Sequence, residues 1–426
     1  GKEVDPDVAR LKSSVDLVQA IEPAVRFYEE PPARGTLVEL DEAELWLSEE
    51  DWLEAFAAPE PGTPHNEARE QVHDALLEIL ADKADEGARE DVERALRGST
   101  DLAEALDRVW PLVEATDLVG DLWTVPAYLR RCAPWLAPEE VRALQRSAPD
   151  AWTASDLPFL DAARARLGDV DASSRRRRLA RAVRSEREYR DRVVEDMIAA
   201  DVDREGVVWM LVNEHGTEDA VVDTASLEDE AREPLAGPFA HIVVDEAQEL
   251  SDAQWLMLVR RCPSRSFTVV GDRAQARAGF RESWVERLDR VGLAGAAVRT
   301  LSVNYRSPQP VMAAAEPVIR AVLPDASVPT SVREGGAPVR HGCVQELERI
   351  VEEWLAAHDD GLACVVGDAP LAPSSRVRVL SPELVKGLEF DLVVLVDPDS
   401  WGTGTTAAVD RYVAMTRATQ ELVILG

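Results

Sequence analysis

Two adjacent carboxylates, Asp245 and Glu246, directly follow the apolar run HIVV. A buried strand that ends on two acids places like charges side by side, which is unfavourable unless a cation lies next to them. Magnesium bound to a nucleotide is such a cation: Asp245 would hold the metal, and Glu246 would orient and deprotonate an attacking water. Taken alone, the pair has a simpler explanation, because an acid near a helix start also caps the helix.

Two later stretches add polar groups of the same kind. VVGDRAQ places Asp272 and Gln275 after the next apolar run, where an uncharged amide can contact a terminal phosphate. NYRS offers Tyr305, whose ring can stack on a base, beside Arg306, whose guanidinium suits phosphate oxygens. GDxxQ alone is weak evidence, and NYRS has an ordinary structural explanation as a strand-to-helix turn with a buried tyrosine and a surface arginine.

The last two stretches lie near the C-terminal end of the sequence. KGLEFDLVV puts Lys386, Gly387 and Glu389 in a loop before an apolar run. YVAMTRA puts Arg417 on a predicted helix before the final run, a position at which an arginine is usually exposed to solvent.

The pattern of residues after residue 238 predicts the strands and helices that position these groups. Short runs rich in Val and Leu alternate there with amphipathic stretches, which predicts parallel strands covered by helices on both faces. Ligands bind at the carboxyl ends of such strands, where Asp245 and Glu246 fall. The predicted strands are FAHIVVDE, SFTVVGD, AVRTLSVNY, GLACVVGD, VRVLSP, FDLVVLVDP and ELVILG.

The first part of the chain is acidic and has mainly helical spacing. DEAELWLSEEDWLEAF and AREDVERALRGSTDLAEALDRVWPLV are predicted helices, and the loop PEPGTPHNEAR between them is a candidate projecting tip because Pro and Gly hold it out of the helices. The run Arg175–Arg178 reads first as a solvated helix start and second as a contact to phosphate or an acidic neighbour.

Composition limits the classes of partner. The chain has 426 residues, 46% of them hydrophobic, with 80 acidic and 47 basic residues and a formal charge of −33. This acidity argues against a broad nucleic-acid surface and favours either a basic protein partner or local basic strips on an acidic body. The four cysteines form no CxxC pair, and no apolar run is long enough to span a membrane, so we expect a cytoplasmic protein without disulfides or a structural zinc.

Together, the five stretches VVDEAQ, VVGDRAQ, NYRS, KGLEFDLVV and YVAMTRA resemble motifs II to VI of the superfamily-one helicases of the UvrD and Rep type. The resemblance implies two RecA-like domains that bind Mg-ATP between them. It also implies roles for single residues. Asp245 would bind Mg2+, Glu246 would act as general base, and Gln275 would contact the terminal phosphate. Arg306 and Arg417 would act as arginine fingers. Tyr305, Glu389, Gly387 and Gln248 would contact the nucleotide.

The family also needs a GxxxxGK[ST] loop upstream, and no stretch of the sequence matches it. The backbone amides and the lysine of that loop bind the triphosphate. We therefore expect these 426 residues alone to be inactive as an ATPase. The helical start without an initiator Met favours a fragment that begins after that loop over a degenerate ATPase.

Three longer segments resemble sequences of the HelD branch of this superfamily, and in particular of its HelR-like members. They are VVDEAQELSDAQWLML, GDRAQARAGFRESWVERLDRVGL and LSPELVKGLEFDLVVLVDP. That resemblance implies an ATPase that binds bacterial RNA polymerase core, inserts an acidic domain into the main channel and recycles the enzyme, with a link to rifamycin tolerance. It implies the first RecA-like domain in residues 1–36 and 151–296, an acidic insertion in 37–150, and the second RecA-like domain in 297–426.

Three functions stay open on the sequence. The first is the ATP-driven motor on RNA polymerase, monomeric on its own, with at most weak nucleic-acid binding. The second is a DNA helicase or translocase, which would need a basic path with stacking aromatic residues, whereas only 5% of the residues are aromatic. The third is a non-catalytic binding module that kept the shape of the ATPase.

Overall fold

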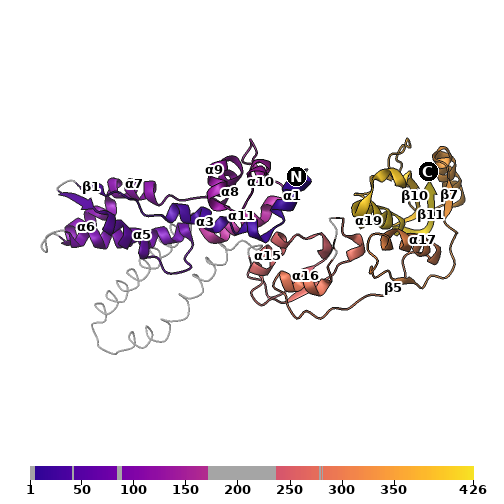
Figure 1. The fold of residues 1–426 in the computed structure, drawn as a ribbon, viewed down its shortest axis with the longest axis horizontal. Helices are drawn as coiled ribbons and strands as arrows, with labels where there is room; N and C mark the ends of the chain where they lie inside the picture. The colour runs from indigo at the N-terminus through magenta and orange to yellow at the C-terminus, as the bar shows by residue number, and fades with distance from the viewer. Residues whose placement is uncertain (1–4, 41–42, 84–88, 171–236, 278–279, 281) are drawn as a thin grey trace, which may run out of the picture. The chain divides into compact units, whose positions relative to one another are not determined.

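The computed structural model describes residues 5–40, 43–83, 89–170, 237–277, 280 and 282–426 (Figure 1). They form two compact units. The first unit comprises Gly1–Pro238 and Ser251–Arg261, and the second comprises Phe239–Leu250 and Cys262–Gly426. The first is mainly helical and the second is built on parallel strands. The chain therefore has the mixed α/β fold with parallel sheets that the sequence predicts.

The first unit contains one β-hairpin and otherwise helices among its described residues. Its elements are α1 Pro6–Lys12, α2 Val15–Val18, α3 Ile21–Arg26, η1 Phe27–Glu29, β1 Thr36–Leu40, β2 Ala43–Leu47, α4 Glu49–Ala57, α5 His65–Asp82, α6 Arg89–Gly98, α7 Thr100–Val109, α8 Ala115–Thr124, α9 Pro126–Cys132, α10 Pro138–Leu144, η2 Ala154–Asp156, α11 Leu157–Leu167 and α15 Asp252–Arg261.

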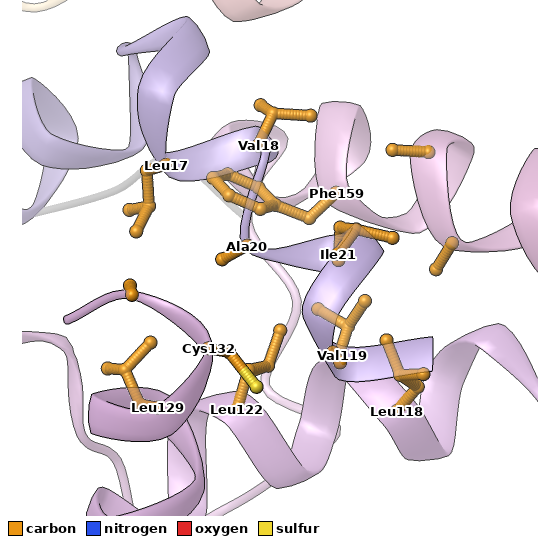
Figure 2. Packing of buried hydrophobic residues seen from close by; sticks show 14 of the residues in the cluster. Leu17, Val18, Ala20, Ile21, Leu118, Val119, Leu122, Leu129, Cys132 and Phe159 are labelled. Carbon is orange, nitrogen blue, oxygen red and sulfur yellow. The ribbon is translucent and has the colours of Figure 1, made fainter. Parts of the chain in front are cut away.

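One hydrophobic core of this unit is centred on α11. Phe159, Ala163 and Leu167 are buried at helical spacing on one face, Pro158 lies in the first turn, and the helix ends at Gly168, whose φ of 73° few other residues adopt. Figure 2 shows side chains from α2, α3, α8, α9 and α11 converging on this core. A second core lies between α4, α5, α7 and the hairpin.

The structure corrects the helical interpretation of the stretch DEAELWL. Residues 43–47 form β2, which pairs with β1 in an antiparallel hairpin. Leu45 and Leu47 are buried while Trp46 between them is 54% exposed, which is the alternation of a strand. The helix begins only at Glu49, after Ser48 and Asp51 form a capping box.

The predicted projecting loop is also shorter than expected. Residues 58–64 connect α4 to α5, but HNEAR already belongs to α5, and both His65 and Asn66 are buried. The His65 ring stacks on Trp110 at 5.0 Å, and Asn66 donates to the carbonyl oxygen of Val113. The second half of the predicted tip is therefore part of the packed interior.

The second unit contains the strand-rich part of the chain. Its elements are β3 Ile242–Val244, η3 Ala247–Glu249, β4 Phe267–Val269, η4 Arg273–Gln275, α16 Trp284–Arg290, β5 Val303–Asn304, α17 Gln309–Arg320, β6 Thr330–Ser331, β7 Arg340–Gly342, η5 Val344–Glu346, α18 Leu347–Ala357, β8 Ala363–Val366, β9 Val377–Leu380, β10 Phe390–Val396, η6 Pro398–Trp401, α19 Gly404–Met415 and β11 Ala418–Leu425.

A five-stranded parallel sheet, in the order β7-β11-β10-β8-β9, organises this unit. All four residues of β8 are buried, and successive ones point to opposite faces. Cys364 and Val366 pack with α17 and α19, whereas Ala363 and Val365 pack with α18. Helices therefore cover both faces, which explains why these strands are continuous apolar runs.

Two smaller parallel pairs complete the described strands: β3 with β4, and β5 with β6. The predicted strand AVRTLSVNY is regular only at Val303–Asn304. The predicted basic helix start at Arg175–Arg178 lies outside the described residues. All four cysteines are free thiols, and no helix in the described part of the chain is long and apolar enough to cross a membrane.

A buried ion pair joins α1 to the start of α11. Lys12 Nζ lies 3.0 Å from Asp156 Oδ1, and the two side chains are 3% and 0% exposed. Burial by itself raises the pKa of Asp156, but the backbone amide of Thr153 and the charge of Lys12 outweigh it, so the pKa is lowered overall. The pair therefore stabilises the first unit.

Replacing Lys12 by Met should lower the free energy of unfolding of the first unit by about 3 kcal/mol, because the Asp156 charge stays buried with one cation fewer. Since the pKa of Asp156 is lowered in the folded state, the loss should be full above about pH 4 and shrink below it. Region-resolved hydrogen exchange in urea would measure it. Arg10→Met, on the same helix but 65% exposed, should cost less than about 1 kcal/mol. Equal losses for the two variants would contradict this assignment.

Candidate functional site

The two acids lie at the carboxyl end of β3, as predicted. β3 ends on the buried Val244, and Asp245 and Glu246 are exposed. Glu246 has a φ of 52°, an uncommon left-handed conformation for this residue type, and its backbone N–H donates to Asp245 Oδ1 at 2.8 Å. The tight turn ends the strand abruptly and keeps both carboxylates at its tip.

Gln248 connects the end of β3 to the end of β4. Its side chain is only 7% exposed; its Nε2 donates to Glu246 Oε2 at 2.6 Å, and its Oε1 accepts from the backbone N–H of Asp272 at 3.0 Å. A Cβ on Gly271 would come within 2.8 Å of that Oε1, so a glycine is needed for the approach. Gln248 therefore holds the two strand ends together.

Asp272 and Gln275 form the next link. The Asp272 carboxylate accepts from the backbone of Ala274 at 2.9 Å and from Gln275 Nε2 at 2.9 Å, which fixes the orientation of the Gln275 amide. The other end of that amide, Oε1, accepts a hydrogen bond from Arg417 Nη2 at 3.0 Å. The predicted phosphate-contacting residue thus already contacts a predicted arginine finger.

Arg417 differs from its prediction as a helical, solvated side chain. α19 ends at Met415, so Arg417 lies in the turn before β11, and it is 4% exposed. Its guanidinium donates to two neutral oxygens, those of Gln275 and of the Val413 backbone. Burial lowers its pKa, and the positive charge of Arg306 lowers it further. The sequence did not reveal this burial because it depends on packing against distant residues.

Lys386, in the loop before β10, lies among the acids. Its Nζ is 2.9 Å from Glu246 Oε2 and 2.7 Å from Glu249 Oε1. Gly387 follows with a φ of 76°, which lets the chain turn at this point. Glu249 was not predicted as a site residue, although its spacing of three from Glu246 on a helical turn could have suggested it.

Tyr305, Arg306 and Glu389 form the remaining part of the site. Tyr305 is 80% exposed, and Arg306 Nε lies 2.6 Å from Glu389 Oε1. The Asn304 side chain accepts from the backbone N–H groups of Arg306 and Ser307, which fixes the turn after β5. An exposed ring leaves room for the predicted stacking on a base, and the Arg306–Glu389 pair joins two of the predicted motifs.

The donor set at the end of β3 suits Mg2+ bound to phosphates. Magnesium in nucleotide sites binds one or two carboxylates, and phosphate oxygens and water supply the other ligands. Asp245 is an exposed carboxylate of that kind. In the described part of the chain, no group of three or more His, Cys, Asp or Glu residues is arranged to hold a metal ion.

Comparisons with known proteins find similarity to helicases over part of the chain. Residues 172–292 match the family model of the UvrD/REP helicase N-terminal domain. Solved structures similar to this chain include the PRRSV helicase, at 18% identity over 43% of this chain and 34% of that chain, with a TM-score of 0.27. Arterivirus nonstructural protein 10 (helicase) has 18% identity over 43% and 38%, TM-score 0.27, and its complex with DNA has 17% over 44% and 39%, TM-score 0.26.

The chain spans less than two fifths of the length of each of these viral helicases. No curated protein matches it. The family match includes Asp245, Glu246, Gln248 and Gln275, so the acids at the end of β3 and the polar residues after β4 lie inside the stretch that resembles the UvrD/REP helicase N-terminal domain.

Arg417→Met should leave the free energy of unfolding of the second unit unchanged within about 1 kcal/mol, or raise it, because the methionine keeps the apolar stem and removes a desolvated charge. Region-resolved hydrogen exchange in urea would measure this. Tripolyphosphate should slow exchange around residues 272–277 in the parent protein but not in the variant. Arg320→Met, which removes an exposed ion pair on α17, should have little effect in either measurement. A loss of 3 kcal/mol or more would show that Arg417 is mainly structural.

Proposed function

We propose that this protein is part of an ATP-hydrolysing motor of the superfamily-one helicase class. One observation carries the proposal: residues from five separate stretches are joined in the second unit. Gln248 links to Asp272, Gln275 links to Arg417, Lys386 links to Glu246, and Arg306 links to Glu389. Bound Mg-ATP would supply the phosphate to be transferred and the metal that offsets its charge.

The chain's own residues would then act on the nucleotide. Asp245 would bind the metal, Glu246 would accept the proton of the attacking water, and Gln275 would contact the terminal phosphate. Arg417 and Arg306 would offset negative charge on the phosphates, and Tyr305, Gly387 and Glu389 would contact the base and sugar. Lys386 Nζ lies 2.9 Å from Glu246 Oε2, the carboxylate that would accept the proton. In the proposed mechanism, Lys386 therefore leaves Glu246 before water is activated.

We propose bacterial RNA polymerase core as the partner, as the resemblance to HelD and HelR proteins implies. The charge of residues 36–110, the acidic lobe, supports a basic partner: it contains 22 acidic and 6 basic residues, a net charge of −16. This lobe would enter the main channel and displace nucleic acid, with rifamycin as a second candidate for release. The lobe has its own hydrophobic core, so it can present this charge on a stable surface.

A DNA helicase or translocase is the second candidate function. The match to the UvrD/REP helicase N-terminal domain favours it, and one of the similar solved structures is a complex with DNA. The formal charge of −33 opposes it, because nucleic-acid affinity depends on neutralising phosphates with Lys and Arg.

A non-catalytic binding module is the third candidate. The 426 residues contain no GxxxxGK[ST] stretch, and Lys386 pairs with both Glu246 and Glu249. Such a module would bind its partner equally well with and without nucleotide, whereas a motor would change its affinity.

The 426-residue protein should bind purified bacterial RNA polymerase core with a dissociation constant below about 1 μM at physiological salt, and bind single-stranded and duplex DNA more weakly than about 100 μM. Fluorescence anisotropy with labelled protein or DNA would measure both. Glu50→Lys with Glu54→Lys, in the acidic lobe, should weaken polymerase binding at least tenfold. Glu348→Lys with Glu352→Lys on α18 is the matched double charge reversal outside the lobe and should not. Tight DNA binding that ignores polymerase would favour the helicase function instead.

In a form of the protein that hydrolyses ATP, Glu246→Gln should lower turnover by about 10² to 10⁴, because the amide keeps the shape of the side chain but cannot accept a proton. Nucleotide affinity should stay within a few fold. Phosphate release and binding of a fluorescent ATP analogue would measure the two effects. Glu348→Gln on α18 serves as an exposed control. Normal turnover by Glu246→Gln would remove Glu246 from the role of base.

A further inference from the structure

Arg277 lies two residues after Gln275 and makes a two-point contact with α19. Its Nε is 2.6 Å from Asp410 Oδ1, and its Nη2 is 2.9 Å from Asp410 Oδ2. The Asp410 side chain is 9% exposed and that of Arg277 is 30% exposed. A bidentate pair this far removed from solvent fixes orientation as well as distance, because both ends of the guanidinium fork are used.

Two more contacts hold the same short segment. Arg277 Nη2 lies 3.1 Å from Glu383 Oε1, in the stretch after β9, and the hydroxyl of Thr406, in the first turn of α19, donates to the backbone oxygen of Arg277 at 3.0 Å. Arg277 is therefore attached through its side chain and its backbone. The attachment points on α19, Thr406 and Asp410, are one helical turn apart.

The same two segments carry a contact of the candidate site. Gln275 Oε1 accepts from Arg417 Nη2, and Arg417 follows the end of α19 by two residues. That contact is one hydrogen bond between a neutral amide and a guanidinium, which allows rotation about its axis. A second attachment at Asp410 removes this freedom, because two separated links between rigid elements fix their relative rotation.

We propose that Arg277 and Asp410 form a positioning pair, which sets the side chain of Gln275 against Arg417. This role rests on the proposed function, in which Gln275 and Arg417 act together on a terminal phosphate. Neither member of the pair touches that phosphate. The pair holds the segment after β4 on α19, so that a movement of α19 is transmitted to Gln275.

The test is hydrogen exchange of the nucleotide-free protein, resolved to single residues by NMR. The reporters are the backbone amides of Gln275 and Ala276, which donate to Asp272 and Arg273. Arg277→Gln and Asp410→Asn should each speed their exchange by about tenfold or more, with little change in α18 or at the centre of β10. The charge-swapped protein, Arg277→Asp with Asp410→Arg, should recover at least half of the lost protection. Arg349→Gln removes an exposed ion pair on α18 and is the control.

Two outcomes would overturn the proposal. Unchanged exchange at Gln275 and Ala276 would show that the segment is held without the pair. A uniform rise along α19 and β11 would show that the pair only stabilises the unit as a whole. Arg277→Lys keeps the charge with a single contact point and should give an intermediate rate, so it decides the question if Arg277→Gln does not fold.

A kinetic measurement tests the positioning role of the pair separately from the proposed ATPase function. Where the protein hydrolyses ATP, Arg277→Gln should lower kcat by tenfold or more with KM changed by less than threefold, because the pair orients groups that act on the reacting phosphate. The exchange experiment contains no nucleotide. Protection that depends on the pair, in a protein with no ATP turnover, would therefore keep the positioning role and reject the ATPase.

Discussion

The position of Arg417, a charge held inside the second unit by two neutral oxygens, constrains most of the candidate site. Its guanidinium reaches Gln275, whose amide is oriented by Asp272, whose backbone N–H is bound by Gln248, which in turn contacts Glu246. Each link depends on the one before it. The carboxylates of Glu246, Glu389 and Asp272 lie near enough to act on the Arg417 charge, so the buried guanidinium and the acids at the strand ends belong to one electrostatic cluster.

The buried Lys12 of the first unit has different surroundings from the buried Arg417 of the second unit. Lys12 lies 3.0 Å from a buried carboxylate that also accepts from Arg146 and Thr153, so its charge is offset within the fold. Burial lowers the pKa of Arg417, whereas the partners of Asp156 lower the pKa of that acid despite its burial. Lys12 therefore has a direct ion pair, whereas Arg417 makes its direct hydrogen bonds to neutral oxygens and interacts with Glu246, Glu389 and Asp272 through their charge.

The sequence predicts the parts of this protein that depend on local pattern. The apolar runs at β3, β4, β8, β9, β10 and β11 are strands, and the polar groups after them lie where parallel strands place them. The helical prediction for the stretch around Trp46 was wrong. Its apolar residues satisfy helical spacing as well as strand alternation, and its pairing with β1 decides between the two. Three features of the site were not predicted: the burial of Arg417, the position of Lys386 between two acids, and the Arg277–Asp410 pair. Each depends on contacts between residues more than 100 positions apart, which no local pattern encodes.

The formal charge of the chain is unevenly distributed between the acidic lobe and the rest of the sequence. The acidic lobe contributes −16 of the formal charge of −33 from 75 residues. Its core, built around Trp52, Leu76 and Leu106, is distinct from the core around Phe159. Surface charge on the lobe can therefore change without altering the packing that holds α11 or the strands of the second unit. The proposed partner binding and the proposed phosphate chemistry then rest on separate sets of residues, so each proposal can be tested by substitutions that leave the other set intact.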